Sequence, residues 1–423
     1  MDKNLYDNYV AILMNELFPA LGCTEPIAVA YAAAKTRETL GTMPEHIDVY
    51  CSGNIIKNVK GVTVPTSGGL RGIDVAAVLG TVGGLAEKKL EVLSRVNDDH
   101  RKKTRLLVSQ GICEVHLVEG NENLYINCVM RAGEETASVE IQTYHTNITK
   151  VGKNGQVLFS KEDMTVVKAD SGNKDLLNMK DIYTFANEVL LEDIQEIIDR
   201  QIEMNSAISK EGLTNSWGAQ VGAELLKHYG DDVKFRAAAY AAAGSDARMN
   251  GCAMPVVINS GSGNQGLTVT MPVVIYAKEL GVSHEKLVRA LVLANMISLN
   301  QKRYIGSLSA YCGATSAAAG AACGVAYLHD ESFEVICNTV VNAIATIGGM
   351  VCDGAKSSCA SKIRSAVDTA LLGYFMAKDG NVFRPGEGMV ERDVEKTIAN
   401  FGRMGRIGMA GTDVEILNIM IGN

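Results

Sequence analysis

The stretch Ala237-Ala-Ala-Tyr-Ala-Ala-Ala-Gly244 decides the fold of the second half of this 423-residue chain. Alanine has the highest intrinsic helix propensity, so a run of this kind predicts a closely packed helix. A similar composition continues in the Gly/Ala-rich stretch 306–328, and alternating apolar patterns are rare after about Asp181. The C-terminal half is therefore predicted to be almost entirely helical.

The first half of the chain changes from helical to alternating spacing. Apolar residues have helical spacing over 4–19, and Glu25-Pro26 opens a second, alanine-rich helix that runs to about Leu40. The stretch His46-Ile-Asp-Val-Tyr-Cys-Ser52 then alternates as a strand does. A helix is expected from about 73 to 95, and further β-rich segments bounded by turn sequences are expected at 104–118, 123–131, 137–146 and 156–160.

These patterns predict an α+β fold in which a mainly helical catalytic domain carries a smaller α/β domain. Residues 1–44 are expected to form N-terminal helices docked on the helical domain, and 45–175 to form the α/β domain. Residues 176–423 are expected to form the helical domain. The polar stretch Ser171-Gly-Asn-Lys174 marks the predicted boundary, and the chain is long enough for two full cores.

Composition and charge limit the kinds of partner. Apolar residues make up 47% and charged residues 21% of the chain, and the net charge is −8 without a long Lys/Arg run. This argues against a nucleic-acid or anionic-membrane partner, so a small molecule is expected. The run from Phe333 to Cys352 has a single charge, but its Asn338, Asn342 and Gly348-Gly349 suit a buried helix better than a membrane span.

The N-terminal residues favour a cytoplasmic location. The chain starts Met-Asp-Lys-Asn-Leu-Tyr6, with an acidic residue where a secretory signal would be basic. Cysteines in such a reducing compartment are more often buried apolar residues, metal ligands or nucleophiles than disulfides.

Three of the ten cysteines carry most of the functional information. Cys312 lies in Ser309-Ala-Tyr-Cys-Gly-Ala-Thr315, and Cys352 and Cys359 lie in Gly348-Gly-Met-Val-Cys-Asp-Gly-Ala-Lys-Ser-Ser-Cys359. Three thiolates hold three irons of a cubane cluster and leave the fourth iron open to substrate as a Lewis acid. The spacing is not a known ferredoxin signature, but the surrounding Gly, Ala and Ser let the backbone approach a bulky inorganic group.

Most of the other cysteines are expected to fill the core. Cys323 lies on the same predicted helix as Cys312, eleven residues further on, which is roughly 16 Å along the helix axis. If that helix is continuous, Cys323 cannot bind the same cluster. Cys337 lies in an apolar helical run, and the cysteines expected on strands are Cys51, Cys113 and Cys128.

The segment Leu21-Gly-Cys-Thr-Glu-Pro26 supplies a second group of candidate residues. Thr24 is a plausible N-cap with Glu25 in the first turn, so Cys23 is expected just before a helix N-terminus, where the dipole favours a thiolate. Such a thiolate acts as a base or a nucleophile. The alternative is that Cys23 fills space beneath the helix entry and that Glu25 only stabilises the dipole.

Two glycine-rich loops complete the candidate site. Ser260-Gly-Ser-Gly-Asn-Gln-Gly266 offers free backbone N–H groups to an anion such as a carboxylate, but it lacks the lysine of a P-loop, so nucleotide binding is not expected. Pro65-Thr-Ser-Gly-Gly-Leu-Arg-Gly72 is a second loop of this kind, and equally a helix entry. The candidate substrate-binding residues are Asn54, Ser67, Gly68, Ser260, Ser262, Asn264 and Gln265.

Taken together, these segments resemble those of the iron–sulfur L-cysteine desulfidases, a family related to the α region of the iron–sulfur L-serine dehydratases. The similarity runs through essentially the whole chain. The matching segments, in order, are Leu21–Pro26, Ser52-Gly-Asn54, Thr66-Ser-Gly-Gly69, Ser260–Gly266 and the set Cys312, Cys352 and Cys359.

The resemblance implies a function for each segment. It makes Cys312, Cys352 and Cys359 the ligands of a [4Fe-4S] cluster, Cys23 the proton-transferring thiolate, and the 260–266 loop the holder of the amino acid. The implied reaction is elimination of sulfide from L-cysteine, giving pyruvate, ammonia and hydrogen sulfide in cysteine catabolism. Some serine dehydratases end in a cysteine that caps the open iron, whereas this chain ends Leu417-Asn-Ile-Met-Ile-Gly-Asn423, so no tail thiolate is expected on the fourth iron.

Several alternatives stay open on sequence alone. The same cluster chemistry would suit an L-serine or other β-substituted amino-acid dehydratase. A pyridoxal-phosphate lyase would use the 260–266 loop for phosphate, and the absorption spectrum would reveal it. A binding protein with a structural zinc at the three cysteines would contain zinc and no acid-labile sulfide. The exact substrate and the oligomeric state, a homo-oligomer included, are not fixed by these patterns.

Overall fold

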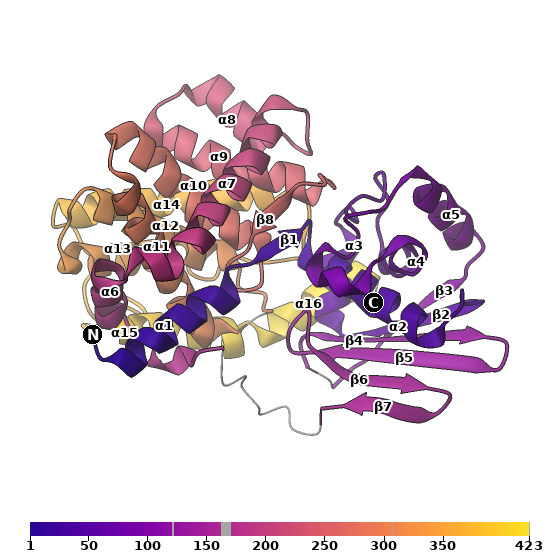
Figure 1. Cartoon of the computed structure of the whole chain (residues 1–423). Helices are drawn as coiled ribbons and strands as arrows, with labels where there is room; N and C mark the ends of the chain where they lie inside the picture. The colour runs from indigo at the N-terminus through magenta and orange to yellow at the C-terminus, as the bar shows by residue number, and fades with distance from the viewer. Residues whose placement is uncertain (121, 162–170, 307, 423) are drawn as a thin grey trace.

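The chain folds into a helical part and a six-stranded mixed sheet that lie side by side, as the computed structural model in Figure 1 shows. The structure describes residues 1–120, 122–161, 171–306 and 308–422. The predicted α+β class, with a mainly helical portion, is confirmed. The division into domains at the predicted boundaries stays a prediction.

The sheet is formed by the first half of the chain in the order β3-β2-β4-β5-β6-β7. Strand β2 pairs in parallel with β3, and the other neighbours are antiparallel. Residues of β4 and β5 alternate between buried and half-buried, because one face of these strands packs on helices. The strands are β2 (His46–Cys51), β3 (Cys113–Leu117), β4 (Tyr125–Ala132), β5 (Glu135–Gln142), β6 (Ile148–Lys153) and β7 (Gln156–Ser160).

Two expectations for this half need correction. The segment 104–118 was expected to be β-rich, but its first part belongs to helix α5 (Asp98–Ser109), which begins at a capping box made by Asn97 and His100. Only Cys113–Leu117 forms a strand. The helix expected over 73–95 ends at Gly83 as α4 (Ile73–Gly83), and a short 3-10 turn, η1 (Ala86–Glu91), follows.

Helices α2 (Thr24–Leu40) and α4 cover the buried face of the sheet. The Thr36 hydroxyl of α2 donates to the Cys128 carbonyl of β4 at 3.4 Å. The two helices are in close contact at Gly80, where a Cβ atom would lie 2.3 Å from the Ala30 carbonyl oxygen. The second N-terminal helix therefore packs on the sheet, whereas α1 (Lys3–Glu16) lies along the helical part (Figure 1).

The helical part is built around two central helices that are buried over most of their length, α11 (His284–Ile305) and α12 (Gly313–Leu328). The run that was predicted to be a buried helix forms α13 (Phe333–Ile347). Among the described residues, no helix combines the length and the apolar character needed to cross a membrane. The other helices are α6 (Met179–Glu188), α7 (Leu191–Thr214), α8 (Val221–Tyr229), α9 (Val233–Met249), α10 (Gly263–Leu280), α14 (Cys359–Lys378), α15 (Val394–Arg403) and α16 (Ala410–Ile421).

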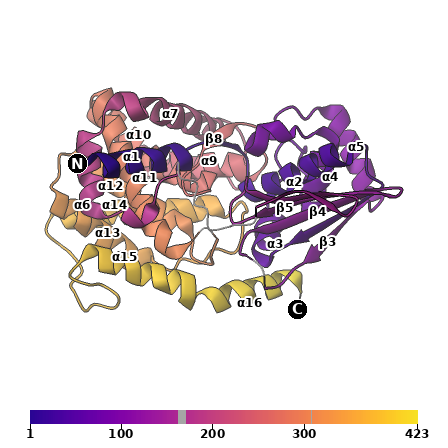
Figure 2. The same cartoon turned by 60° about the horizontal axis from the view of Figure 1, so that its bottom comes forward.

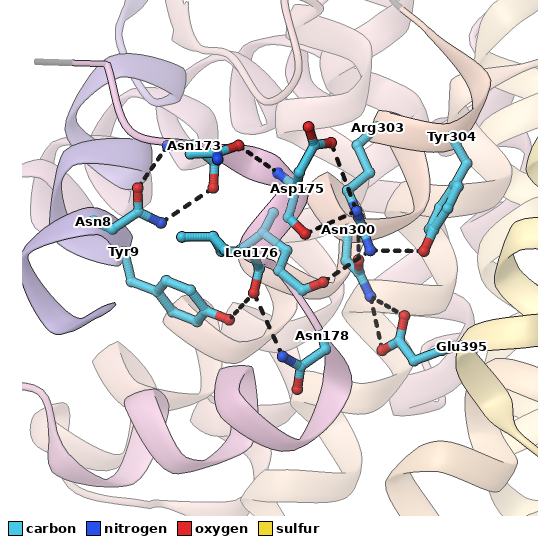
Figure 3. A network of polar contacts seen from close by, with 11 residues as sticks. Asn8, Tyr9, Asn173, Asp175, Leu176, Asn178, Asn300, Arg303, Tyr304 and Glu395 are labelled. Atoms are coloured by element: carbon cyan, nitrogen blue, oxygen red, sulfur yellow. Dashed lines mark hydrogen bonds and ion pairs between the residues drawn. The ribbon is translucent and has the colours of Figure 1, made fainter. Parts of the chain in front are cut away.

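A polar network anchors α1 to the helical part, as Figure 3 shows. The Tyr9 hydroxyl of α1 donates to the Leu176 carbonyl at 3.0 Å. From the other side, the Arg303 guanidinium of α11 donates to the Leu177 carbonyl at 2.9 Å. Asn300, one turn earlier on α11, donates to the Glu395 carboxylate of α15 at 3.3 Å. Segments from both ends of the chain are thus held on one central helix.

Two further contacts join the helical part to the sheet part. Strand β1 (Pro19–Leu21) pairs antiparallel with β8 (Pro255–Val257), so the segment before α2 lies beside the segment before α10. Helix α16 extends from the helical part to α3 (Gly53–Lys60), as Figure 2 shows. There Asp413 forms an ion pair with the buried Lys57 of α3.

A buried carboxyl group in α9 gives a testable pH dependence of stability. Asp246 is fully buried and accepts the Gly222 N–H of α8 at 3.3 Å, and burial raises its pKa from the ordinary 3.8 to about 6. Because the folded chain holds this proton more tightly than the unfolded chain, the free energy of unfolding falls as pH rises from about 4 to 6 and stays lower above it. Asp246→Asn is therefore expected to raise the free energy of unfolding at pH 7.5 by about 2–3 kcal/mol.

Urea unfolding of both proteins at several pH values measures this effect. The gain from the substitution should shrink towards pH 4, where the wild-type carboxyl group is protonated in both states. A gain that does not change between pH 4 and 7.5 would show that Asp246 is not the titrating group.

Candidate functional site

The structure brings Cys312, Cys352 and Cys359 to one place from three elements. Cys312 is the residue before α12, Cys352 lies in the loop after α13, and Cys359 is the first residue of α14. The segments of the first two cysteines run antiparallel: the Cys312 N–H donates to the Met350 carbonyl at 2.9 Å, and the Cys352 N–H donates to the Ala310 carbonyl at 2.6 Å. This pairing brings the two thiols close enough to influence each other's charge state.

The electrostatic surroundings favour negative charge at Cys352, whereas the pKa of Cys312 is raised by its hydrogen bond to Cys352 and by burial, and burial raises the pKa of Cys359. The pKa of Cys352 is lowered by the hydrogen bond from the Cys312 thiol and by the positive charges of Lys57 and Lys362. Lys302 of α11 also lies near both thiols, and burial lowers its pKa to about 8. Cationic neighbours of this kind stabilise a cluster of thiolates.

Cys323 lies outside this group. Helix α12 runs without interruption from Gly313 to Leu328, and the Cys323 thiol donates to the Ile336 carbonyl of α13 at 3.5 Å. Cys323 is completely buried among apolar residues. It is thus a core residue, as expected. The expectation that Cys51, Cys113 and Cys128 lie on strands is also confirmed, on β2, β3 and β4.

Cys23 lies beside the three-cysteine group. It packs in a small apolar cluster with Val62 and Met249, and Cys359 packs against the same cluster. The pairing of β1 with β8 carries the chain to this point, and α2 begins directly after Cys23. The Cys23 side chain is 2% exposed, so bulk water has almost no access to its sulfur.

The charge state of Cys23 differs from the sequence-based expectation. Cys23, not Thr24, is the N-cap residue of α2, and its side chain caps no backbone N–H. Burial and the negative charge of Glu25 raise the pKa of Cys23 well above its usual value, although the Arg248 charge acts in the opposite direction. The structure therefore holds a protonated thiol that donates to Glu25 Oε2 at 2.9 Å, because desolvation outweighs the helix dipole.

Glu25 is the centre of a buried polar group next to Cys23. Its carboxylate accepts from the Asn58 amide at 3.3 Å and from the Thr24 hydroxyl at 3.2 Å, and His145 Nε2 lies 3.9 Å from Oε1. Burial by itself would raise the pKa of Glu25, but His145 and the Cys23 hydrogen bond outweigh it and lower the pKa to about 2. Glu25 is therefore ionised and accepts the hydrogen bond of the Cys23 thiol.

The 260–266 loop lies next to this group. Its last residues start α10, and the Thr24 hydroxyl donates to the Gly261 carbonyl at 3.1 Å. Ser260 and Ser262 are half-buried, whereas Gln265 is buried. Asn264 Oδ1 accepts from the Arg248 guanidinium of α9 at 3.1 Å. The loop thus reaches the same site as Cys23 and carries an arginine at its side.

The other predicted substrate-binding residues lie on the sheet side of Cys23. The Ser67 hydroxyl accepts the Leu70 N–H at 2.9 Å, within its own turn. Gly68, in the same turn, has a left-handed backbone, and its carbonyl accepts from Arg105 of α5. Asn54 lies in the first turn of α3, and its buried Oδ1 has no hydrogen-bond partner in the part of the chain that the structure describes.

Four residues of the site were not predicted from the sequence. They are Arg248, His145, Lys302 and Lys362, which lie on α9, the β5–β6 connection, α11 and α14. None of them belongs to a motif. For Arg248 the sequence shows only an isolated arginine close to the end of an alanine-rich helix, and basic residues are common at helix C-termini for other reasons.

Comparisons with known proteins identify the family of this chain. Residues 87–418 match the family described as serine dehydratase alpha chain. The chain belongs to this family. It is 48% identical over 419 residues, 99% of this chain and 100% of the relative, to the UPF0597 protein of Lachnoclostridium phytofermentans. It is also 48% identical to the UPF0597 protein DSY1109 of Desulfitobacterium hafniense, over 98% of this chain and 97% of the relative.

A third relative also matches this chain over almost its full length. The UPF0597 protein of Finegoldia magna is 47% identical over 98% of this chain and 99% of its own length. Membership of the serine dehydratase alpha chain family confirms the suspected relation and supports an enzyme of the dehydratase or lyase type.

Proposed function

We propose that the protein is a [4Fe-4S]-dependent lyase that eliminates sulfide from L-cysteine and yields pyruvate, ammonia and hydrogen sulfide. The observation that supports it best is the meeting of Cys312, Cys352 and Cys359 beside Cys23. Ligands and proton-transferring thiol come from opposite ends of the chain, and family membership favours this type of enzyme.

The residues present fit a cluster held by Cys312, Cys352 and Cys359. The three thiols lie close enough to affect one another's charge, and cysteine thiolates are the usual ligands of iron–sulfur clusters. A glycine follows Cys312 directly and another lies two residues after Cys352, so little side-chain bulk surrounds the two sulfurs. Bound there, the cluster would supply an iron that acts as a Lewis acid on the leaving group of the substrate.

The chain's own residues then perform the proton chemistry. Cys23, in its thiolate form, takes the α-proton of the amino acid, and Glu25 Oε2, 2.9 Å away, accepts the hydrogen bond of the thiol and so orients its sulfur. Because Cys23 is 2% exposed, this transfer is shielded from bulk water. The N-terminus of α10, with its free backbone N–H groups, faces the same site and binds the substrate carboxylate.

The identity of the leaving group follows from ligand chemistry. A thiolate is a softer donor than a hydroxyl group and suits iron in such a site better, so L-cysteine is proposed before L-serine. The family description supports L-serine as the second candidate.

Anaerobic purification tests the proposal directly. The protein is expected to contain iron and acid-labile sulfide, and to form pyruvate and hydrogen sulfide from L-cysteine at a kcat/KM well above that for pyruvate formation from L-serine. Exposure to air should abolish both the iron content and the activity. Zinc without acid-labile sulfide, or the absorption band of a pyridoxal cofactor, would contradict the proposal. Faster turnover of L-serine than of L-cysteine would show that L-serine is the preferred substrate.

A further inference from the structure

Two buried side chains, one in the 260–266 loop and one beside it, each have a polar atom without a hydrogen-bond partner among the described residues. They are Arg248, whose side chain leaves Nε unpaired, and Gln265, whose Oε1 is unpaired among the residues that the structure describes. The two residues are only 2% and 6% exposed. A buried donor or acceptor without a partner is unfavourable, so such atoms indicate a ligand that pairs with them.

Arg248 is the donor of this pair. A Cβ atom on Gly263 would lie 2.3 Å from Nε, so only a glycine lets the guanidinium approach the first turn of α10. Nη1 donates to Asn264 Oδ1 at 3.1 Å, which fixes the plane of the guanidinium. Its charge acts on the thiol of Cys23, so it lies near the atom that takes the α-proton. An arginine in this position is suited to bind a carboxylate.

Gln265 is the acceptor of this pair. A Cβ atom on Gly313 would lie 2.5 Å from its amide carbon and 2.7 Å from Oε1. Gly313 directly follows the proposed ligand Cys312, so the amide of Gln265 lies between the loop and the three-cysteine group. An unpaired amide oxygen in this position accepts from a donor such as an ammonium group.

We infer that Arg248 and Gln265 together recognise the two charged groups of an α-amino acid: Arg248 binds the carboxylate, and Gln265 Oε1 binds the α-ammonium. The inference rests on the proposed function for the identity of the substrate class. It goes further in naming which side chain binds each group. The substrate must then carry a free carboxylate and a free amine on one carbon, and amides, esters and simple carboxylic acids are poor ligands.

Binding of three inert ligands to the purified holoprotein separates the two roles. L-Alanine carries both groups, L-alaninamide lacks the carboxylate and propionate lacks the amine. Arg248→Gln is expected to lower the affinity for L-alanine and for propionate roughly 10- to 100-fold, which is the effect of losing a charged hydrogen bond. The affinity for L-alaninamide should not change. Gln265→Leu is expected to lower the affinity for L-alanine and L-alaninamide and to leave the affinity for propionate unchanged. Isothermal titration calorimetry measures all nine affinities.

Three further variants guard against unfolding or a general effect. Arg236→Gln, on the same helix but paired with Glu279 at the surface, should bind all three ligands as the wild type does. Arg248→Lys keeps the charge and should lose less L-alanine affinity than Arg248→Gln. Gln265→Glu keeps an acceptor and should retain L-alaninamide binding. Equal losses for all three ligands in Arg248→Gln and Gln265→Leu would overturn the inference.

The outcome also distinguishes this inference from the proposed function. None of the three ligands has a leaving group, so their binding requires no turnover. Selective losses in a protein that does not convert L-cysteine would contradict the proposed reaction and support the inference. If the wild type converts L-cysteine but binds L-alanine no better than L-alaninamide and propionate, the proposed reaction is supported and the inference is contradicted.

Discussion

Replacing Cys312, Cys352 or Cys359 by serine is expected to strip the protein of iron and to reduce turnover below detection. A serine hydroxyl is a harder donor than a thiolate and does not hold iron in such a cluster. The three thiols lie close together and affect one another's charge, so losing one leaves an incomplete ligand set. Iron and acid-labile sulfide per chain, measured after anaerobic purification, report the loss independently of activity.

Cys323→Ser is the matched control for these variants. Cys323 lies on α12, the helix that follows Cys312, but its thiol bonds to the Ile336 carbonyl in the core. This variant is expected to lose some stability and to keep its iron. Full iron content in the triple variant of Cys312, Cys352 and Cys359 would refute the assignment of the ligands.

Cys23→Ala is expected to keep the iron-loaded protein and to lower kcat by a factor of roughly 10² or more, the usual scale for removing a general base. Cys23 packs beside Cys359, but its thiol donates a hydrogen bond to Glu25 Oε2 at 2.9 Å. Its role in the proposed reaction is therefore proton transfer. Absorption spectra and iron content, compared with kcat for L-cysteine, separate the two functions.

Glu25→Gln gives an independent check of the same step. The neutral amide is a weaker acceptor for the Cys23 thiol than the carboxylate and orients its sulfur less well, so turnover should fall in this variant as well, while the hydrogen bond to Asn58 still has an acceptor. Loss of iron in Cys23→Ala would make Cys23 a ligand or a residue needed for folding, and would contradict its assignment as the base.

Local sequence patterns predicted the main elements of the fold. The alanine-rich runs form α2 and α9, and the alternating stretch at His46 forms β2, because in both cases local preference agrees with the packing. The segment 104–118 was misassigned because Leu106, Leu107 and Val108 look like a strand in isolation. The capping box at Asn97 starts a helix that includes them.

The candidate site was only partly predictable, for a physical reason. Cys23, Cys312, Cys352 and Cys359 were recognised as individual residues, and the structure shows that they meet. The role of Arg248 depends on the absence of a side chain at Gly263, and the charge state of Cys23 depends on burial beside Glu25. Both are consequences of tertiary packing, which a local motif does not contain.

The pairing of β1 with β8 has a consequence for the order in which the protein is made. The strand that precedes Cys23 leaves the ribosome early, but its partner Pro255–Val257 follows only after the sheet and the four helices α6 to α9. Closing so long a loop is entropically unfavourable until later contacts compensate, so this pairing forms late in folding. During synthesis Cys23 therefore stays apart from Cys312, Cys352 and Cys359, and the nascent chain acquires its reactive centre only after Cys359 has left the ribosome.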